Sequence, residues 1–367
     1  MPAKRRESAR PPRVRKGQLD VTLTREEFRR RIMERFFDPA FEGIPSDVER
    51  VVEVAWDAYI KYRKSPRARA AGRGFADPGF KLPVEWLETR RRIQEADRRR
   101  KNRRGRSRIL LVCGSSRNDQ TCPGEMSKTF RLLTLARETI ESAAGFEVEV
   151  LDLSRITAEY GKAILPCKSC VSTAMPLCHW PCSCYPNHAM GQVQDWMSDI
   201  YEMWAAAHGV MILSPVNWYQ APSVLKLMMD RLVCADGGNP DPTTTGGKDP
   251  AKAKALELKG WDYPKHLAGR ACAVVVHGDA AGVETLRRIL ADWLSDLGLI
   301  SAGPAGELGR YLGYYRPYAT SHDDLDRDLD LQEEVRHAAR ALMERVRQIR
   351  AGTCKEAEKG LSEPRPK

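Results

Sequence analysis

The sequence contains no apolar run approaching the ~20 residues that a membrane-spanning helix needs, and its N-terminus has no apolar signal core. We therefore expect a soluble, cytoplasmic protein without a membrane partner. A Gly-x-Gly-x-x-Gly motif is also absent, so a separate dinucleotide site of the Rossmann type is not supported. Gly246-Gly247-Lys248 does not qualify as a P-loop, because the preceding strand, the earlier glycine and the following Ser or Thr are missing.

Nothing in the sequence directs secretion, so we interpret its ten cysteines as ligands, redox thiols or core residues rather than disulfides. The charge is uneven along the chain. Residues 1–108 carry 31 Lys and Arg against 16 Asp and Glu, a net charge of +15. The remaining 29 basic and 33 acidic residues give −4, and the two values sum to the overall +11.

The basic excess belongs to an N-terminal extension. Residues 1–18 lack apolar periodicity and are predicted to form a disordered basic tail. Residues 19–107 are predicted to form two or three helices and a basic linker, the Arg-rich stretch 98–106. The helix starts are indicated by two capping boxes, Thr24 with Glu27 and Ser46 with Glu49, and by Pro83.

Apolar strands and amphipathic helices alternate through residues 108–302, apart from a Gly- and Pro-rich insertion at 235–268. This order predicts an α/β fold, a doubly wound parallel sheet of five strands covered on both faces. Residues 303–367 are assigned to a C-terminal helix and tail. The expected strands are 109–113, 147–152, 210–214, 271–276 and 299–300, and the expected helices are 127–144, 191–207, 222–233, 282–297 and 329–350.

The first strand is followed by Gly114 and a polar loop that leads to the helix expected at 127–144. Free backbone N–H groups and the positive end of a helix dipole meet at such a place, which favours anion binding. An ordinary strand-to-helix turn is the alternative. Hydroxyl donors and one cation are available from Ser115, Ser116, Arg117, Ser127 and Thr129.

Three stretches, GSSRNDQTCPGEMSKT, SPVNWYQAPSVLKLMMDRL and VVVHGDAAG, follow the first, third and fourth strands. Together they resemble the NADPH-dependent FMN reductases of the flavodoxin-like superfamily, over about residues 108–302. The resemblance implies an FMN cofactor and NAD(P)H as co-substrate. Cys122-Pro123-Gly124 departs from the family pattern. By position, Ser115, Arg117, Ser127 and Thr129 would bind the phosphate, Pro215, Val216, Asn217, Trp218 and Tyr219 would line the flavin, and His277, Gly278 and Asp279 would close its far side.

The residues themselves fit a flavin, which needs a dianion site, a flat wall and nearby backbone donors. Trp218 and Tyr219 directly follow a buried strand and offer an aromatic wall, although packing in a core or an interface is an equal alternative. Without a Rossmann motif, NAD(P)H would stack on the flavin from solvent or from a neighbouring subunit. We assign no catalytic side chain, because the cofactor carries the chemistry.

Five cysteines lie within 18 residues in PCKSCVSTAMPLCHWPCSCYPNH, after the second strand. The C-x2-C spacing suits zinc or an iron–sulfur cluster, and the location resembles the cysteine motif of iron–sulfur flavoproteins, except that Thr173 replaces the third cysteine. Packing thiols or a redox pair are the alternative. The predicted metal ligands are Cys167, Cys170, Cys178 and Cys182, with His179 or His188 as substitutes, whereas Cys113, Cys234 and Cys272 are interpreted as small core residues.

The leading hypothesis is an FMN-dependent NAD(P)H oxidoreductase that passes a hydride to FMN and then electrons to an unknown acceptor. A second hypothesis is an electron carrier that resembles iron–sulfur flavoproteins. A third is a nucleic-acid or partner-binding protein, motivated by the +15 extension. We favour packing of residues 20–97 on the main body of a homo-oligomer, a dimer or tetramer, and do not expect nucleic acid as a partner.

Overall fold

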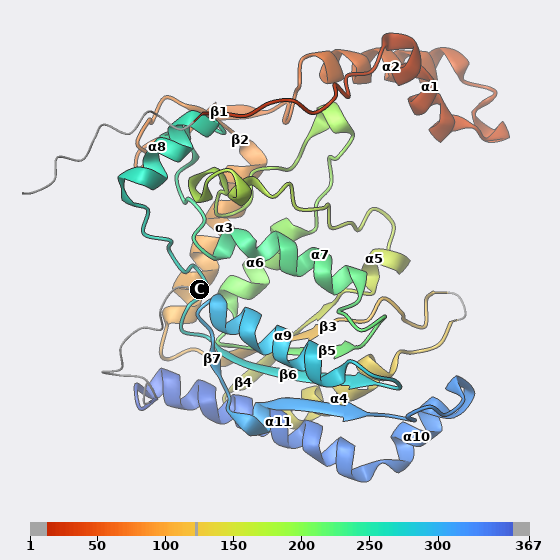
Figure 1. Ribbon diagram of the computed structural model, residues 1–367, viewed down its shortest axis with the longest axis vertical. Coiled ribbons are helices and arrows are strands. Elements are labelled where there is room, and N and C mark those ends of the chain that lie inside the picture. The colour runs from red at the N-terminus through yellow and green to blue at the C-terminus, as the bar shows by residue number, and fades with distance from the viewer. Residues whose placement is uncertain (1–12, 122–123, 355–367) are drawn as a thin grey trace, which may run out of the picture. The chain divides into compact units, whose positions relative to one another are not determined.

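The structure is a computed structural model that describes residues 13–121 and 124–354 (Figure 1). Most of the predicted basic tail, Cys122 with Pro123 and the end of the C-terminal tail lie outside the described residues. By packing, the chain divides into two discontinuous units. The domain boundaries expected from the sequence stay a prediction. Unit 1 comprises residues up to Arg92, Gly161–Asp199 and Leu227–His266, and unit 2 comprises Ile93–Tyr160, Ile200–Lys226 and the chain from Leu267.

Unit 2 contains a parallel sheet of six strands in the order β4-β3-β5-β6, with two short strands, β7 and β8, that both pair with β6 (Figure 1). The central strands are mostly apolar and almost entirely buried, as a sheet covered on both faces requires. This confirms the predicted doubly wound fold. The strands are β3 (Ser107–Cys113), β4 (Phe146–Asp152), β5 (Gly209–Pro215), β6 (Ala271–Gly278), β7 (Ile300–Ser301) and β8 (Glu307–Tyr311).

Strand β8 was not predicted from the sequence, which assigned its residues to the C-terminal region. Its five residues, Glu-Leu-Gly-Arg-Tyr, contain a single buried apolar side chain, Leu308. Such a segment has no strand periodicity of its own, so its strand conformation depends on its pairing with β6. Beyond β8 the chain continues through α10 (Ser321–Arg327).

Helices α4 (Lys128–Glu141) and α11 (Leu329–Ala351) cover one face of this sheet, where Leu132, Leu213 and Leu342 belong to one buried cluster (Figure 1). On the other face, α9 (Val283–Asp296) packs on β6, and its Trp293 meets Trp204 of α6 edge to face. Burial of this apolar surface is the main stabilising term of unit 2. The unit also holds α5 (Arg155–Ala158), most of α6 (Met197–Ala206) and the start of α7 (Ser223–Arg231).

The helix expected at 191–207 begins only at Met197, so its first turns were predicted wrongly. Gly191 has a left-handed backbone (φ 63°), and Val193 is 48% exposed. The Asp195 carboxylate is not free to cap an earlier start of this helix, because it pairs with the buried Arg231 at 2.6 Å. Trp196 is buried as expected, but it precedes the helix.

Unit 1 contains the N-terminal helices and a two-stranded antiparallel sheet. Thr24 caps the first helix by accepting a hydrogen bond from the Glu27 amide, as predicted. The second predicted cap is wrong: α2 begins at Pro45, which suits a first helical position, and Ser46 lies inside the helix. The elements are α1 (Arg25–Met33), α2 (Pro45–Ile60), β1 (Ala68–Ala70), β2 (Lys81–Pro83), the start of α3 (Val84–Lys101) and α8 (Pro250–Gly260).

The Arg-rich stretch is partly helical, because α3 extends to Lys101. Asp97 pairs with Arg100 at 2.9 Å and with Lys101 at 2.6 Å. The guanidinium of Arg350 in α11 donates to the carbonyls of Arg103 and Gly105 at 2.7 and 2.8 Å. These contacts hold the end of the Arg-rich stretch against α11 within unit 2. In the part of the chain that the structure describes, no helix is both long and apolar enough to cross a membrane.

Candidate functional site

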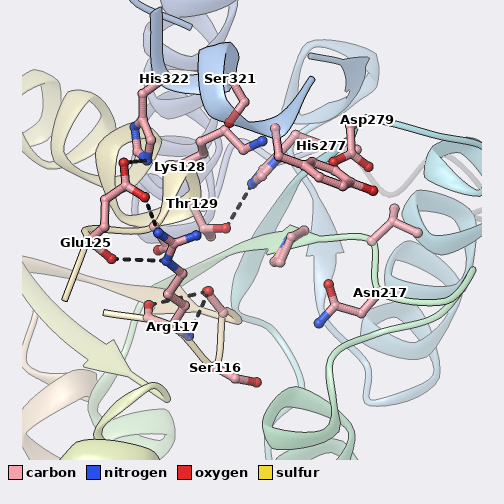
Figure 2. Close-up of a pocket in the computed structure, with 16 residues that line it drawn as sticks. Ser116, Arg117, Glu125, Lys128, Thr129, Asn217, His277, Asp279, Ser321 and His322 are labelled. Atoms are coloured by element: carbon pink, nitrogen blue, oxygen red, sulfur yellow. Dashed lines mark hydrogen bonds and ion pairs between the residues drawn. The ribbon is translucent and has the colours of Figure 1, made fainter. Parts of the chain in front are cut away.

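A cavity of about 350 Å³ opens at the carboxyl edge of the sheet in unit 2 (Figure 2). The loops after β3, β5 and β6 converge there, as the carboxyl ends of neighbouring parallel strands must. The segment around α10 contributes a fourth wall. The cavity is lined by Ser115, Ser116, Arg117, Glu125, Ser127, Lys128, Thr129, Pro215, Val216, Asn217, His277, Gly278, Asp279, Tyr318, Ser321 and His322.

The N-terminus of α4 forms the polar floor of the cavity. Ser127 is its N-cap, and its Oγ accepts a hydrogen bond from the Phe130 amide at 3.1 Å. The amides of Lys128 and Thr129 lie in the first turn, where no carbonyl within the helix can accept from them. Two free amides, a helix dipole and the Lys128 ammonium therefore favour a bound anion.

Thr129 and His277 are buried and connect α4 to β6. Thr129 Oγ1 lies 2.8 Å from His277 Nε2 (Figure 2). Burial, aided by the charge of Lys128, lowers the pKa of His277 to about 3, so the imidazole is neutral near pH 7. If Nε2 carries the proton and donates to Thr129, the threonine hydroxyl is left to donate into the cavity.

One wall carries a row of polar side chains: Arg117, Glu125 and His322 follow one another in Figure 2. Arg117 pairs with the Glu125 carboxylate and also donates to the Glu125 carbonyl at 3.2 Å. His322 Nε2 lies 3.6 Å from the other carboxylate oxygen. Arg117 is thus partly neutralised at the cavity wall.

The end of β5 and the loop after it contribute Pro215, Val216 and Asn217, and the Val216 amide donates to the His277 carbonyl at 2.9 Å. Asn217 and Gln220 exchange two backbone hydrogen bonds of 3.0 Å around Trp218 and Tyr219. Both central residues have a positive φ, 48° and 64°, and their side chains are 92% and 63% exposed. This tight turn directs the predicted aromatic wall outward, so neither residue lines the cavity.

The loop after β6 places backbone close to the cavity, and two glycines make this possible. A Cβ on Gly278 would lie 2.9 Å from Val283 Cγ2. Gly282 has φ +115°, and a Cβ there would lie 3.1 Å from the Tyr219 Cα. Any larger residue at these two positions would push the loops apart.

Ten of the twelve predicted cofactor-binding residues therefore line one cavity, and the two that do not are Trp218 and Tyr219. The prediction missed Glu125, Lys128, Tyr318, Ser321 and His322, and it listed Ser116 only as a possible donor. Lys128 could have been found as the first residue of the capped helix. For the C-terminal residues, the signal was the run of four tyrosines between Tyr311 and Tyr318.

The cysteine loop belongs to unit 1, and the predicted set of metal ligands is not supported there. Among residues 13–121 and 124–354, no three His, Cys, Asp or Glu side chains are grouped to hold a metal ion. Cys170 Sγ instead lies 3.5 Å from Cys184 Sγ. Burial raises the pKa of Cys178 well above its usual value, which opposes the thiolate that a metal needs.

The two candidate histidines of this loop also have other partners. His179 is buried, with Nδ1 2.5 Å from Ser183 Oγ and Nε2 3.2 Å from Thr245 Oγ1. His188 lies in a short 3-10 turn (His188–Met190), and its amide donates to the Lys64 carbonyl. Cys113, Cys234 and Cys272 are buried, as predicted for small core residues.

A sequence model of the NADPH-dependent FMN reductase family matches residues 107–304, 198 of the 367 residues. The chain belongs to this family. The match includes every predicted cofactor-binding residue and stops before α10. Among curated proteins, no sequence matches the chain.

Several solved structures resemble this FMN reductase family member. RosB with its bound intermediate 8-demethyl-8-formylriboflavin-5'-phosphate is 16% identical, with a TM-score of 0.47 over 68% of this chain and 82% of RosB. The apo NADH:FMN oxidoreductase EMOB is 12% identical, with a TM-score of 0.34 over 68% and 92% of the two chains. NAD(P)H:quinone oxidoreductase from Methanothermobacter marburgensis is 15% identical, with a TM-score of 0.34 over 68% and 97%. None of these scores reaches 0.5, so the assignment depends on the family match.

Proposed function

We propose that the protein is an NAD(P)H oxidoreductase that binds FMN in the cavity at the carboxyl edge of the unit 2 sheet. The observation that carries this proposal is the convergence of three loops from separate parts of the sequence on the capped N-terminus of α4. Family membership supplies the cofactor class.

The donor set of the cavity fits the phosphate of FMN. Ser127 and Thr129 offer hydroxyls, the first turn of α4 offers two amides, and Lys128 offers a half-buried cation. Burial lowers the pKa of Lys128, and Asp279 and Glu125 oppose this effect. A dianion would satisfy these donors and would compete with Glu125 for Arg117.

The flavin ring would lie between the loops after β5 and β6. Val216 offers an apolar contact and Asn217 a polar one, and the glycine-rich backbone of 278–282 leaves room for a flat ligand. Trp218 and Tyr219 would cover the outer edge of the ring rather than form its wall. Their strained, exposed turn is typical of a residue pair held for binding.

When bound, FMN accepts a hydride from reduced nicotinamide and returns the electrons to an acceptor. The chain's own residues bind and orient: α4 fixes the phosphate, and neutral His277 fixes the Thr129 hydroxyl. No side chain is required as an acid or base for the hydride transfer. The exposed aromatic pair leaves NAD(P)H an approach from solvent or from a neighbouring subunit.

The test is anaerobic mixing of the purified protein with FMN and then with NADPH or NADH. We expect stoichiometric FMN to bind and the visible flavin absorbance to bleach on addition of the nicotinamide. The Ser127→Asp variant keeps an oxygen for the helix cap but places a negative charge at the phosphate. Binding of FMN by this variant with unchanged affinity would contradict the proposed site.

The alternatives have less support. The absence of a metal-binding group among the described residues gives the iron–sulfur carrier no observation of its own. The ion pairs of the Arg-rich stretch favour packing over nucleic-acid binding. The cytoplasmic location, the homo-oligomer and the identity of the acceptor stay predictions, and sedimentation of the full chain tests the oligomer.

A further inference from the structure

Two cysteines and one lysine of unit 1 form a cluster outside the proposed FMN site. Cys170 Sγ and Cys184 Sγ are 3.5 Å apart, and Lys248 Nζ lies 2.7 Å from Cys184 Sγ and 3.5 Å from Cys170 Sγ. Cys184 is 4% exposed, whereas Cys170 is partly exposed. The cluster therefore combines one accessible thiol, one protected thiol and a shared cation.

The position of Lys248 is built into its loop. A 3-10 turn (Pro242–Thr245) ends at Gly246 and Gly247, which both have a left-handed backbone, φ +56° and +82°. The buried Thr245 hydroxyl donates to the carbonyl of Pro242 or Gly247, at 3.1 and 3.0 Å. The Gly-Gly-Lys stretch that fails as a P-loop thus forms the turn that carries the lysine to the two thiols.

The charges of the cluster favour a thiolate. Cys184 Sγ and Lys248 Nζ each lie 3.5 Å from Cys170 Sγ, so a thiol donor and a cation both face the sulfur that would carry the charge. Burial alone would lower the pKa of Lys248, but the neighbouring sulfurs of Cys184 and Cys170 raise it above its usual value. A partly exposed thiolate next to a second thiol is the arrangement of a redox-active pair.

The other cysteines of the loop are poor partners for this chemistry. Hydrogen bonding with Cys184 and burial raise the pKa of Cys182 well above its usual value. Burial likewise raises the pKa of Cys167, whose Sγ accepts a hydrogen bond from the Ser169 amide at 3.4 Å. These thiols stay protonated near neutral pH and attack slowly.

We propose that Cys170 and Cys184 form a redox-active dithiol that exchanges with low-molecular-weight disulfides, with Lys248 as the group that positions and stabilises the thiolate. Cys170 Sγ attacks one sulfur of the small disulfide, and the first small thiolate leaves. The Cys184 thiol then gives its proton to solvent, and its sulfur attacks Cys170 Sγ and releases the second small thiolate. Two protein thiols are oxidised to one disulfide, and one small disulfide is reduced to two thiols. The two sulfurs must approach from 3.5 Å to about 2.05 Å.

The test uses the full chain, reduced and freed of reductant, then incubated with oxidised glutathione and quenched by alkylation. Peptide mapping should find a Cys170–Cys184 disulfide, and the oxidised protein should carry two fewer alkyl groups than the reduced protein. Cys170→Ser and Cys184→Ser should abolish this product, whereas Cys167→Ser, a matched change in the same loop, should retain it. Lys248→Met should move the midpoint of the pH profile for alkylation of Cys170 to higher pH, because the thiolate loses its neighbouring cation, and Lys252→Met should leave the profile unchanged.

Two results would overturn the proposal. One is a pair that stays reduced in excess oxidised glutathione while the protein is folded. The other is stoichiometric zinc or iron in the wild-type protein that Cys170→Ser removes, because a metal would occupy the same thiolates. If Cys184→Ser fails to fold, the Cys170 and Lys248 variants still test whether the dithiol forms a disulfide. FMN binding is measured on the same samples, so failure of the dithiol is distinguished from failure of the proposed function.

Discussion

Thr129 Oγ1 and His277 Nε2, on residues 148 positions apart in the sequence, lie 2.8 Å from each other at the end of the central strands. The pair ties the first turn of α4 to the end of β6, and both side chains are almost fully buried. A hydroxyl held in this way can present its proton to a ligand without a further loss of side-chain entropy.

The Thr129 hydroxyl is expected to contribute directly to FMN affinity. Thr129→Val keeps the shape of the side chain and removes the donor, so FMN binding should weaken by about 1.5–3 kcal/mol. Thr134→Val is the matched control, because the hydroxyl of Thr134 bonds to the Phe130 carbonyl in the same helix and does not line the cavity. Fluorescence titration with FMN measures the affinity of both variants. Equal affinities for FMN would show that the Thr129 hydroxyl does not contact the cofactor.

Protonation of His277 is expected to destabilise the fold in acid. Its pKa is about 3 in the folded chain and about 6.5 in an unfolded one, so the unfolded state binds more protons between these values. The free energy of unfolding should therefore fall as the pH drops from about 6.5 towards 3, by up to about 1.4 kcal/mol per pH unit from this residue. Denaturant titrations should show a shallower pH slope for His277→Asn than for the wild-type protein, and an equal slope would contradict this role of His277.

The positive φ of Trp218 gives a test of the turn. At an ordinary position Ala is more stable than Gly by about 0.5–1 kcal/mol, but a left-handed position reverses this order. We expect Trp218→Gly to have a higher free energy of unfolding than Trp218→Ala, with FMN affinity reduced in both. Urea denaturation of the two variants shows which is more stable. A more stable Ala variant would refute the left-handed backbone conformation at residue 218.

The ion pair of Asp195 with Arg231 is nearly inaccessible, with side chains 9% and 1% exposed. Asp195→Asn leaves a buried charge without its carboxylate and should cost about 3–5 kcal/mol of unfolding free energy. The double variant Asp195→Leu, Arg231→Met should recover much of that loss. Asp292→Asn, at the exposed pair of Arg288 and Asp292, should change the free energy of unfolding little. Thermal unfolding compares this control with the single and double variants of the buried pair.

The parts of the fold that are set by local chemistry were predictable from the sequence. The apolar runs located β3, β4, β5 and β6, and ten of the predicted cofactor-binding residues line the cavity at the carboxyl ends of β3, β5 and β6. Ser127 and the helix that it caps, α4, are adjacent in the sequence, so the cap could be recognised from the sequence alone. Such signals are local, so a single sequence carries them.

The parts of the fold and of the site that could not be predicted depend on contacts between residues far apart in the sequence, which no local pattern encodes. Strand β8 forms by pairing with β6, and the chain after it contributes Tyr318, Ser321 and His322 to the cavity. Trp218 and Tyr219 were expected in the cavity, but the left-handed turn directs them outward. Cys184 was left out of the predicted ligand set, although the fold brings it to Cys170 and Lys248.

The central claim is that the first turn of α4 binds the phosphate of FMN, and comparison of FMN with riboflavin tests it most directly. The two flavins share the ring and differ in the phosphate, so calorimetric titration of each into the wild-type protein isolates the anion site. We predict that FMN binds at least about a hundredfold more tightly, as two charge-assisted hydrogen bonds imply, and that Ser127→Asp abolishes this preference. Equal affinity of the wild-type protein for FMN and riboflavin would contradict the claim.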